Sequence, residues 1–370
     1  MFATRRSHAL LTALLAGFAG LVPPGPAQSP PRKTRNVIFV MTDGLRWQEV
    51  FGGAEAALLD PRHSDDAETR ELKRLFWRET AAERRQALMP FLWTVIAGQG
   101  QIYGNRGIGS EASVTNGLNF SYPGYNEILT GTPDPRVDSN DKKPNPNITV
   151  LEWLHRKPAF AGKVAAFGAW DVFPYIFNAG RSGLTVNAGY DPLTAPPVTP
   201  RIELLNRLKL ETGQWPDEPF DAPTFLTALE YLKLHQPRIL YLSLGETDEW
   251  AHDGKYGLYL KAAKRCDQYV KELWDMVQSM PRYRGTTSLI LGVDHGRGLG
   301  AEWRSHGQKI AESKYVWMAF LGPDTPPLGE RSKVAPVTES QVAATLAALL
   351  GEDYGGAFPQ AGKPIAEVLR

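Results

Sequence analysis

The chain contains six short apolar runs that have the length and composition of buried β-strands, and these runs constrain its fold more than any other feature. Segments with helical periodicity or loop composition separate the runs. Such alternation is typical of a mainly parallel sheet that helices cover on both faces. The expected strands lie at 36–42, 101–104, 163–168, 238–244, 288–293 and 315–321. We therefore expect an α/β fold with a mainly parallel central sheet sandwiched by helices.

The spacing of apolar residues also predicts several connecting helices. Helices are expected as a pair within 65–98, near 200–211, from 259 to 277 and over 339–350. Cys266 falls on the apolar face of the third of these, so it is interpreted as a core residue. Because it is the only cysteine, neither an intrachain disulfide nor a cysteine-rich metal site can form.

Acidic residues and histidines gather where three of the expected strands end. Asp43, Asp248 and Asp294 follow the runs at 36–42, 238–244 and 288–293. Three histidines lie close behind these acids, namely His252, His295 and His306. Open α/β sheets bind ligands at the carboxyl ends of their strands. We therefore expect these six side chains to converge on one crevice.

Carboxylates and imidazoles in this arrangement are suited to metal binding. Asp248 and His252 are four residues apart, so on a helical turn both project from one face. Burying three carboxylates together without a cation would be costly. Mixed oxygen and nitrogen ligands favour zinc, with manganese or iron as alternatives. The competing interpretation is that each residue is an ordinary polar loop residue or a hydrogen-bonded core histidine.

Four segments resemble the metal-binding motifs of the alkaline phosphatase superfamily, in particular its nucleotide pyrophosphatase/phosphodiesterase-like branch. They are Val37–Gly44, Gly245-Glu-Thr-Asp-Glu-Trp-Ala-His252, Val293-Asp-His-Gly296 and Ser305-His-Gly307. The resemblance extends from residue 36 to about residue 325. It implies an alkaline-phosphatase-like fold with inserted cap segments and two divalent metal ions. One ion would be bound by Asp248, His252 and His306, and the other by Asp43, Asp294, His295 and the oxygen of a nucleophile.

The same resemblance places a serine or threonine nucleophile at a helix N-terminus shortly before a Thr-Gly pair. Ser121 precedes Thr130-Gly131 in this way, and Pro123 occupies a position that the first turn of a helix permits. Ser121 is therefore the expected catalytic residue and a further metal ligand. Ser113 and Thr115 are competing hydroxyls, and a purely capping role for Ser121 is the structural alternative.

Two further segments are expected to face the substrate. Residues 132–147 have loop composition, and the resemblance implies an asparagine that contacts the phosphate after Thr130-Gly131, for which Asn140 is the nearest match. Residues 172–222 mix aromatic residues, glycine and proline around a short helix, as expected for a substrate-facing insertion.

The resemblance implies hydrolysis of a small phosphate ester through a phosphoserine intermediate. A sulfatase-like relative is an alternative, although Tyr125 stands where the sulfatase motif has arginine. The motifs also leave open a phosphoglycerate-mutase-like enzyme and a catalytically inactive metal-bearing binding protein. The formal net charge of +1 gives no electrostatic basis for nucleic-acid binding.

The N-terminus has the pattern of a secretory signal peptide. Arg5-Arg6 precede an apolar stretch from Ala9 to Val22 and small residues around Ala27, so residues 1–28 are expected to be cleaved. The arginine pair leaves both general and twin-arginine export open. Nothing after residue 30 has the apolar length of a transmembrane segment. We therefore expect one alkaline-phosphatase-like domain over 33–370, exported to the periplasm or secreted.

Overall fold

The computed structural model describes residue 1, residues 32–59 and residues 66–369. From Arg32 onward the chain forms one compact unit. Apart from residue 1, the signal peptide expected at 1–28 lies outside the described residues. No helix among the described residues combines the length and the apolar composition that are needed to cross a membrane.

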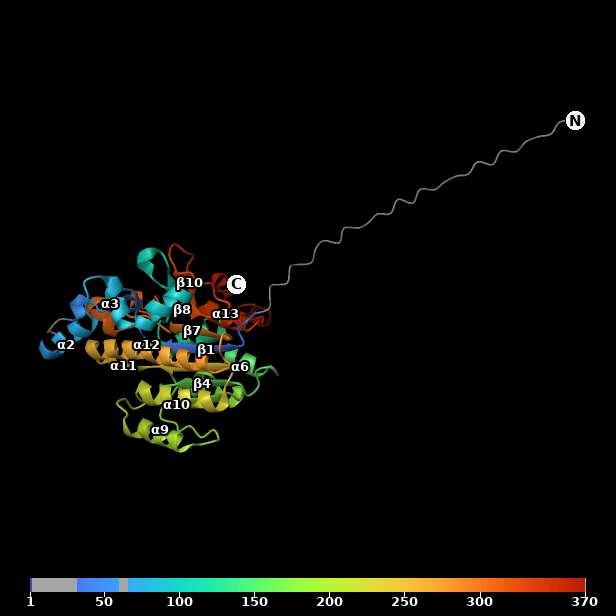
Figure 1. Cartoon of the computed structure of the whole chain (residues 1–370), viewed down its shortest axis with the longest axis horizontal. Coiled ribbons are helices and arrows are strands. Elements are labelled where there is room, and N and C mark those ends of the chain that lie inside the picture. Colours follow the sequence, from blue (N-terminus) through green and yellow to red (C-terminus); the bar gives the residue numbers. More distant parts are fainter. Residues whose placement is uncertain (2–31, 60–65, 370) are drawn as a thin grey trace. The chain divides into compact units, whose positions relative to one another are not determined.

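The described part of the chain contains an eight-stranded sheet with the order β5-β4-β6-β1-β7-β8-β2-β9. Its strands are β1 (Asn36–Thr42), β2 (Gln101–Tyr103), β4 (Val164–Gly168), β5 (Thr185–Ala188), β6 (Ile239–Leu244), β7 (Thr287–Val293), β8 (Met318–Leu321) and β9 (Gly329–Glu330). Strands β5, β4, β6, β1 and β7 are parallel, whereas β8 is antiparallel to both β7 and β2. In Figure 1, β8, β7, β1 and β4 follow one another down the view in this order. A small separate pair joins β3 (Ala112–Ser113) and β10 (Val337–Thr338).

Helices cover the sheet on both faces. Every residue of β1, β6 and β7 is buried, and successive strand residues point to opposite faces, so neither face of these strands meets solvent. The longer helices are α2 (Asp66–Phe76), α3 (Ala81–Leu88), α5 (Ser121–Thr130), α9 (Pro200–Glu211), α10 (Asp221–His235), α12 (Tyr256–Ser279) and α13 (Val342–Leu349). The shorter ones are α1 (Trp47–Gly52), α4 (Ala97–Gln99), α6 (Val150–His155), α7 (Phe173–Ile176), α8 (Ala179–Ser182), α11 (Glu246–His252) and α14 (Tyr354–Ala357). Helix α10 packs on β4 and β6, and Figure 1 shows α9 beyond α10.

The register of the central strands brings three chain segments to one edge of the sheet. Thr42 at the end of β1 pairs with Leu244 at the end of β6 and with Val293 at the end of β7. Because the three strands are parallel and end level with one another, the residues that follow them lie side by side. The fold therefore positions the segments that begin with Asp43, Gly245 and Asp294 next to each other.

The fold class expected from the sequence is confirmed, since the sheet is mainly parallel and helices flank it. All six expected strands are present with small shifts at their ends. The sequence pattern missed β5, because Thr185–Ala188 is short and only half apolar. This strand lies inside the segment 172–222 and forms one edge of the main sheet, so that segment contributes to the sheet as well as to the surface beside the strand ends.

Candidate metal centre and adjoining cavity

The six expected ligands occupy two groups in which one donor atom from each residue lies within 4.8 Å of the others. The groups are Asp248, His252, His306 and Asp43, Asp294, His295, and together they are called the metal-ligand cluster below. Their grouping is the same as the division that the family resemblance implies.

The first group converges on one point. Nε2 of His252 lies 3.0 Å from Nε2 of His306 and 3.0 Å from Oδ2 of Asp248. Nδ1 of His306 faces the carbonyl oxygen of Asn119 at 3.3 Å, and a carbonyl can only accept, so Nδ1 is the protonated nitrogen. Nε2 of His306 is therefore left with its lone pair directed at the other two side chains, as metal binding requires.

The second group is buried, and only Asp43 in it reaches the cavity described below. Nε2 of His295 lies 3.4 Å from Oδ1 of Asp43 and 3.5 Å from Oδ2 of Asp294. Nδ1 of His295 faces the carbonyl oxygen of Gly296 at 3.0 Å, which fixes the tautomer as in His306. The two groups adjoin, because the same Nε2 is 3.7 Å from Oδ1 of Asp248.

Two carboxylate oxygens of the cluster show that these residues fit a metal ion. In Asp43, Oδ2 accepts a hydrogen bond from Tyr125, whereas Oδ1 is buried without a hydrogen-bond partner. In Asp294, Oδ1 accepts from the backbone N–H of Gly44, whereas Oδ2 is buried without one. Burying a carboxylate oxygen without a partner costs free energy. Each of these two oxygens faces the other ligands of the second group, where a bound cation would become its partner.

The electrostatics of the cluster reflect the crowding of its charges. Burial, together with the neighbouring Asp248, raises the pKa of Asp43 well above its ordinary value, and burial with Asp43 nearby does the same to Asp294. Burial lowers the pKa of His295 to about 4. Burial also acts to raise the pKa of Asp248, but Arg297 and His252 outweigh it and keep that pKa well below the ordinary range. The protein alone therefore stabilises a negative charge on only one of the three acids, and a bound cation would stabilise the others.

Neighbouring side chains hold the carboxylates in place. Arg297 is fully buried and donates to both Oδ1 and the backbone oxygen of Asp248. The hydroxyl of Tyr125 is 2.8 Å from Oδ2 of Asp43 and 2.9 Å from the Ser243 hydroxyl. Gly44 has φ of +57°, and a Cβ there would lie 2.4 Å from Oδ1 of Asp248, so only glycine allows this approach.

Ser121 is the first residue of α5 and faces the metal-ligand cluster. Its hydroxyl oxygen is 3.3 Å from Nε2 of His295. Phe120 occupies the N-cap position, and the Ser121 hydroxyl bonds to His295 instead of to the helix backbone. Gly124 lets α5 approach the end of β7, because a Cβ there would lie 2.3 Å from the Asp294 backbone oxygen.

The competing hydroxyls are placed elsewhere. Thr115 donates its hydroxyl hydrogen to Glu127, and Ser113 is part of β3. Neither lines the cavity that contains Ser121.

A cavity of about 320 Å³ opens beside Ser121 and the metal-ligand cluster. Asn140 lines it, and its Oδ1 accepts a hydrogen bond from the backbone N–H of Tyr122 at 3.0 Å. This contact fixes the amide plane at the start of α5 and leaves the Nδ2 hydrogens as the available donors. Lys142 also lines the cavity and forms a 2.6 Å ion pair with Asp171.

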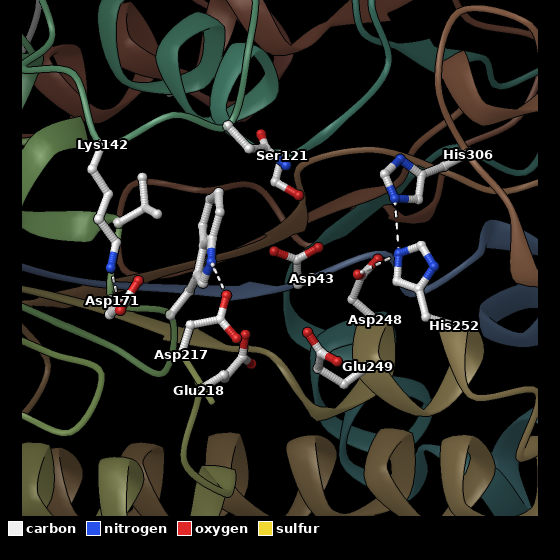
Figure 2. Close-up of a pocket in the computed structure, with 13 residues that line it drawn as sticks. Asp43, Ser121, Lys142, Asp171, Asp217, Glu218, Asp248, Glu249, His252 and His306 are labelled. Carbon is white, nitrogen blue, oxygen red and sulfur yellow. Dashed lines mark hydrogen bonds and ion pairs between the residues drawn. The ribbon is translucent and has the colours of Figure 1, made fainter. Parts of the chain in front are cut away.

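The cavity lining includes three further carboxylates, which we call the acidic wall: Asp217, Glu218 and Glu249. Figure 2 shows His252, His306 and Asp248 on one side of the cavity and Asp171, Asp217 and Lys142 on the other, with Asp43 between them. Burial and the neighbouring Glu249 raise the pKa of Glu218 well above its ordinary value. Burial and Asp248 raise the pKa of Glu249 to about 7.

Several residues of the site are not identified by the sequence patterns. Arg297 follows the Val293-Asp-His-Gly296 motif directly, and Glu249 is adjacent to Asp248, so position next to a motif could have indicated both. Asp217 and Glu218 lie in a loop rich in proline and acidic residues, which carries no recognisable signal. Arg181, a cation of the substrate-facing segment, forms an ion pair with Glu152 and does not line the cavity.

Comparison with known proteins gives structural relatives only. No family model matches the chain, and no curated relative matches its sequence. The alkaline phosphatase PafA superposes with a TM-score of 0.58 at 12% identity, covering 92% of this chain and 100% of that one. The phosphonate monoester hydrolase SpPMH from Silicibacter pomeroyi gives 0.54 at 14% identity over 91% of this chain and 75% of that one. BT1596, a 2-O GAG sulfatase, gives 0.53 at 16% identity over 91% and 74%.

These neighbours are members of the alkaline phosphatase superfamily and act as hydrolases on phosphate, phosphonate or sulfate esters. At such low identities the likeness shows the fold. The described chain therefore has an alkaline-phosphatase-like fold, with six potential metal ligands and a serine at the carboxyl ends of its central strands.

Proposed function

We propose that this chain, which has an alkaline-phosphatase-like fold, is an exported hydrolase that binds two divalent metal ions and cleaves phosphate esters through Ser121. The observation that carries the proposal is the position of Ser121. It begins a buried ten-residue helix, and its hydroxyl lies 3.3 Å from His295 in the metal-ligand cluster.

The two groups of ligands suit two ions, one bound by Asp248, His252 and His306 and the other by Asp43, Asp294, His295 and Ser121. Zinc is the first choice because imidazole and carboxylate ligands are mixed, and manganese or iron would also be accepted. When bound, such ions would lower the pKa of the serine hydroxyl and offset negative charge that develops at phosphorus.

The residues of the chain supply the remaining parts of the reaction. Ser121 Oγ forms a bond to phosphorus, the bond from phosphorus to the leaving oxygen breaks, and the alcohol departs. The N-terminus of α5 favours the negative charge on Oγ while this occurs. Water then attacks phosphorus, the bond to Oγ breaks, and Ser121 regains its proton. Asn140, whose amide plane Tyr122 fixes, donates from Nδ2 to a non-bridging oxygen in both steps.

A sulfatase-like reaction is less well supported. Sulfatases use a modified cysteine or serine in a motif that ends in arginine, and here Tyr125 occupies that position and binds Asp43 through its hydroxyl. A catalytically inactive binding protein is also less well supported, because all six ligands and the serine come together.

The decisive experiment is a parallel assay of the purified, metal-loaded protein on phosphate monoesters, phosphate diesters and sulfate esters. We expect phosphate esters to be cleaved and about two transition-metal ions per chain in mass-spectrometric metal analysis. The Ser121→Ala variant should keep its circular dichroism spectrum while losing turnover.

Intact mass spectrometry of acid-quenched turnover mixtures should show a phosphoryl adduct on the wild type and none on Ser121→Ala. Ser110→Ala, at a buried serine that does not line the cavity, serves as the control. A metal-free protein, or full activity in Ser121→Ala, would contradict the proposal. Turnover of sulfate esters alone would favour the sulfatase-like alternative.

A further inference from the structure

The cavity beside Ser121 contains more carboxyl groups than the metal-ligand cluster uses. Asp43 and Asp248 belong to that cluster, and Asp171 is paired with Lys142. The three residues of the acidic wall remain, and none of them forms an ion pair with any residue that the structure describes. A substrate that enters this cavity therefore meets a surplus of carboxylates next to the reacting phosphate.

Glu218 is the wall residue that most needs a positive partner. Its side chain is 5% exposed, it lines the cavity, and its Oε1 has no hydrogen-bond partner. Oε1 rests against Gly245, where a Cβ would lie only 1.3 Å away, so this glycine makes room for the carboxylate. Figure 2 shows the carboxylates of Glu218 and Glu249 turned toward the cavity. A buried carboxylate in this position is stabilised when a cation enters.

The partner that the wall fits is larger than a metal ion. Within the described residues, two groups of three ligands meet the distance that one ion can span, and the acidic wall is not one of them. The three carboxylates do not converge within that distance. Such spacing suits an organic cation, whose charge is distributed over several carbon and hydrogen atoms.

Trp170 completes the environment for an organic cation. It lines the same cavity, it is half-buried, and its Nε1–H donates to Oδ2 of Asp217 at 3.3 Å, which fixes the indole beside the wall. In the described chain, a Lys or Arg covers the rings of Trp47, Trp77, Trp93 and Trp153, but none covers Trp170. An indole face next to carboxylates is a favourable environment for an ammonium group.

We infer that the acidic wall and Trp170 bind an ammonium group, so that the preferred substrates are phosphate esters of amino alcohols. The inference rests on the proposed function for its use in turnover, although binding of the cation can be measured without any reaction. Quaternary and primary ammonium groups share this chemistry, and the substrates below separate them.

The test compares two esters that differ only in charge. One is para-nitrophenyl phosphorylcholine, and the other is para-nitrophenyl neohexyl phosphate, in which carbon replaces the quaternary nitrogen. Both release the same phenol, so the ratio of their kcat/KM values reports the substituent alone. We expect the metal-loaded wild type to prefer the cationic ester by about tenfold or more. The corresponding phosphorylethanolamine diester tests the primary amine, and phosphocholine with neohexyl phosphate provides a monoester pair.

The variants Glu218→Gln and Trp170→Leu should bring the ratio close to one. Glu272→Gln, on the exposed side of α12, is the matched control and should keep the wild-type ratio. Circular dichroism and thermal melting identify any variant that fails to fold, and Asp217→Asn then provides a less buried change in the same wall. A wild-type ratio near one, with both esters cleaved, would overturn the inference and leave the proposed function standing. It would mean that the wall merely offsets the charge of the metal ions.

Calorimetric titration of the metal-loaded protein with choline chloride, and with neohexyl alcohol as the neutral control, tests the same point without turnover. We expect choline to bind, the alcohol to bind at least about tenfold more weakly, and Glu218→Gln to abolish the difference. If no ester is cleaved, the proposed function fails while this titration still decides the inference. Equal binding of the two molecules by the wild type, or no binding of either, would overturn it.

Discussion

The metal-ligand cluster and the acidic wall meet at one cavity, and they hold their carboxylates differently. In the cluster, Asp43 and Asp294 each have one oxygen hydrogen-bonded by the protein and the other directed at a common point. In the wall, Glu218 and Glu249 do not form a metal-ligand group and lack ion-pair partners in the described chain. The cluster is therefore organised for small ions at a fixed position, whereas the wall is organised for a larger cation that arrives with the substrate.

Removing a metal ligand should have the largest effect of the changes considered below. His306→Ala deletes one of three ligands in the first group, so the protein should lose one metal ion and kcat/KM should fall on the order of 10³-fold. Metal analysis and para-nitrophenyl ester kinetics measure both effects. His155→Ala, at a half-buried histidine outside the cavity, is the control. Retention of both ions and of activity would mean that the first group is not a metal site.

Asp267 is a buried carboxylate whose two oxygens both accept hydrogen bonds from the protein. It therefore contrasts with Glu218 of the acidic wall, whose Oε1 has no hydrogen-bond partner in the described chain. The two oxygens of Asp267 accept backbone N–H groups of Phe91 and Leu92, yet burial still raises its pKa from 3.8 to about 6. Since the folded-state pKa lies above the unfolded value, the folded protein keeps a proton that the unfolded chain releases between these pH values. The free energy of unfolding should therefore fall by about 3 kcal/mol as pH rises through this window.

Asp267→Asn removes that titration, so the difference in unfolding free energy between the wild type and the variant should shift by about this amount between pH 4 and pH 7. Urea unfolding at a series of pH values measures it. Asp275→Asn on the same helix is the exposed control, and its difference from the wild type should change little. If the difference in unfolding free energy between Asp267→Asn and the wild type did not change with pH, the pKa of Asp267 would be the same in the folded and the unfolded protein. Burial would then not raise it.

Tyr125 tests whether the fixed oxygen of Asp43 matters to the cluster. Tyr125→Phe removes the 2.8 Å hydrogen bond to Oδ2 of Asp43 without changing the ring, so metal affinity or kcat should fall about 10- to 100-fold. Competition with a chelator and steady-state kinetics measure the two quantities. Tyr103→Phe, which removes a buried hydroxyl bonded to Gln101 instead, should leave both near wild type. Equal behaviour of the two variants would show that orientation of Asp43 does not limit metal binding.

The cluster and the wall also differ in how far the sequence predicts them. The ligands Asp43 and Asp294 directly follow buried strands, and strand ends can be recognised from apolar runs, so their convergence could be expected. Ser121 required the family resemblance, because a serine at the start of a helix looks the same whether it caps or reacts. The structure places it in the cavity with Phe120 as the N-cap residue.

The wall could not be predicted because its residues come from segments without periodic patterns. Asp217 and Glu218 lie in a loop between α9 and α10, and only the folded chain brings them to the cavity that Ser121 lines. The roles of Arg297 and Tyr125 could not be predicted either, since they depend on contacts with Asp248 and Asp43 across more than forty residues of chain. Local spacing carries no information about such contacts. The segment 172–222, which the sequence predicts to face the substrate, supplies Val172, Asp217 and Glu218 to the cavity, although its role as an insertion stays a prediction.

Lys142 tests, with the smallest expected effect, whether the wall side of the cavity favours a cationic substrate. It is the one lysine or arginine among the described residues that line this cavity, and it is half-exposed. Its ion pair with Asp171 offsets one carboxylate beside the wall. Lys142→Ala leaves Asp171 unpaired and makes the wall side more negative, so preference for the choline ester over its neohexyl counterpart should rise about two- to fivefold. Lys143→Ala, whose partner Asp141 lies outside the cavity, is the matched control and should leave the ratio unchanged. Because exposed charges are screened, the effect of Lys142→Ala should shrink in high salt. A lower preference in this variant would mean that the lysine contacts the phosphate, and that the cavity is organised for an anionic substituent.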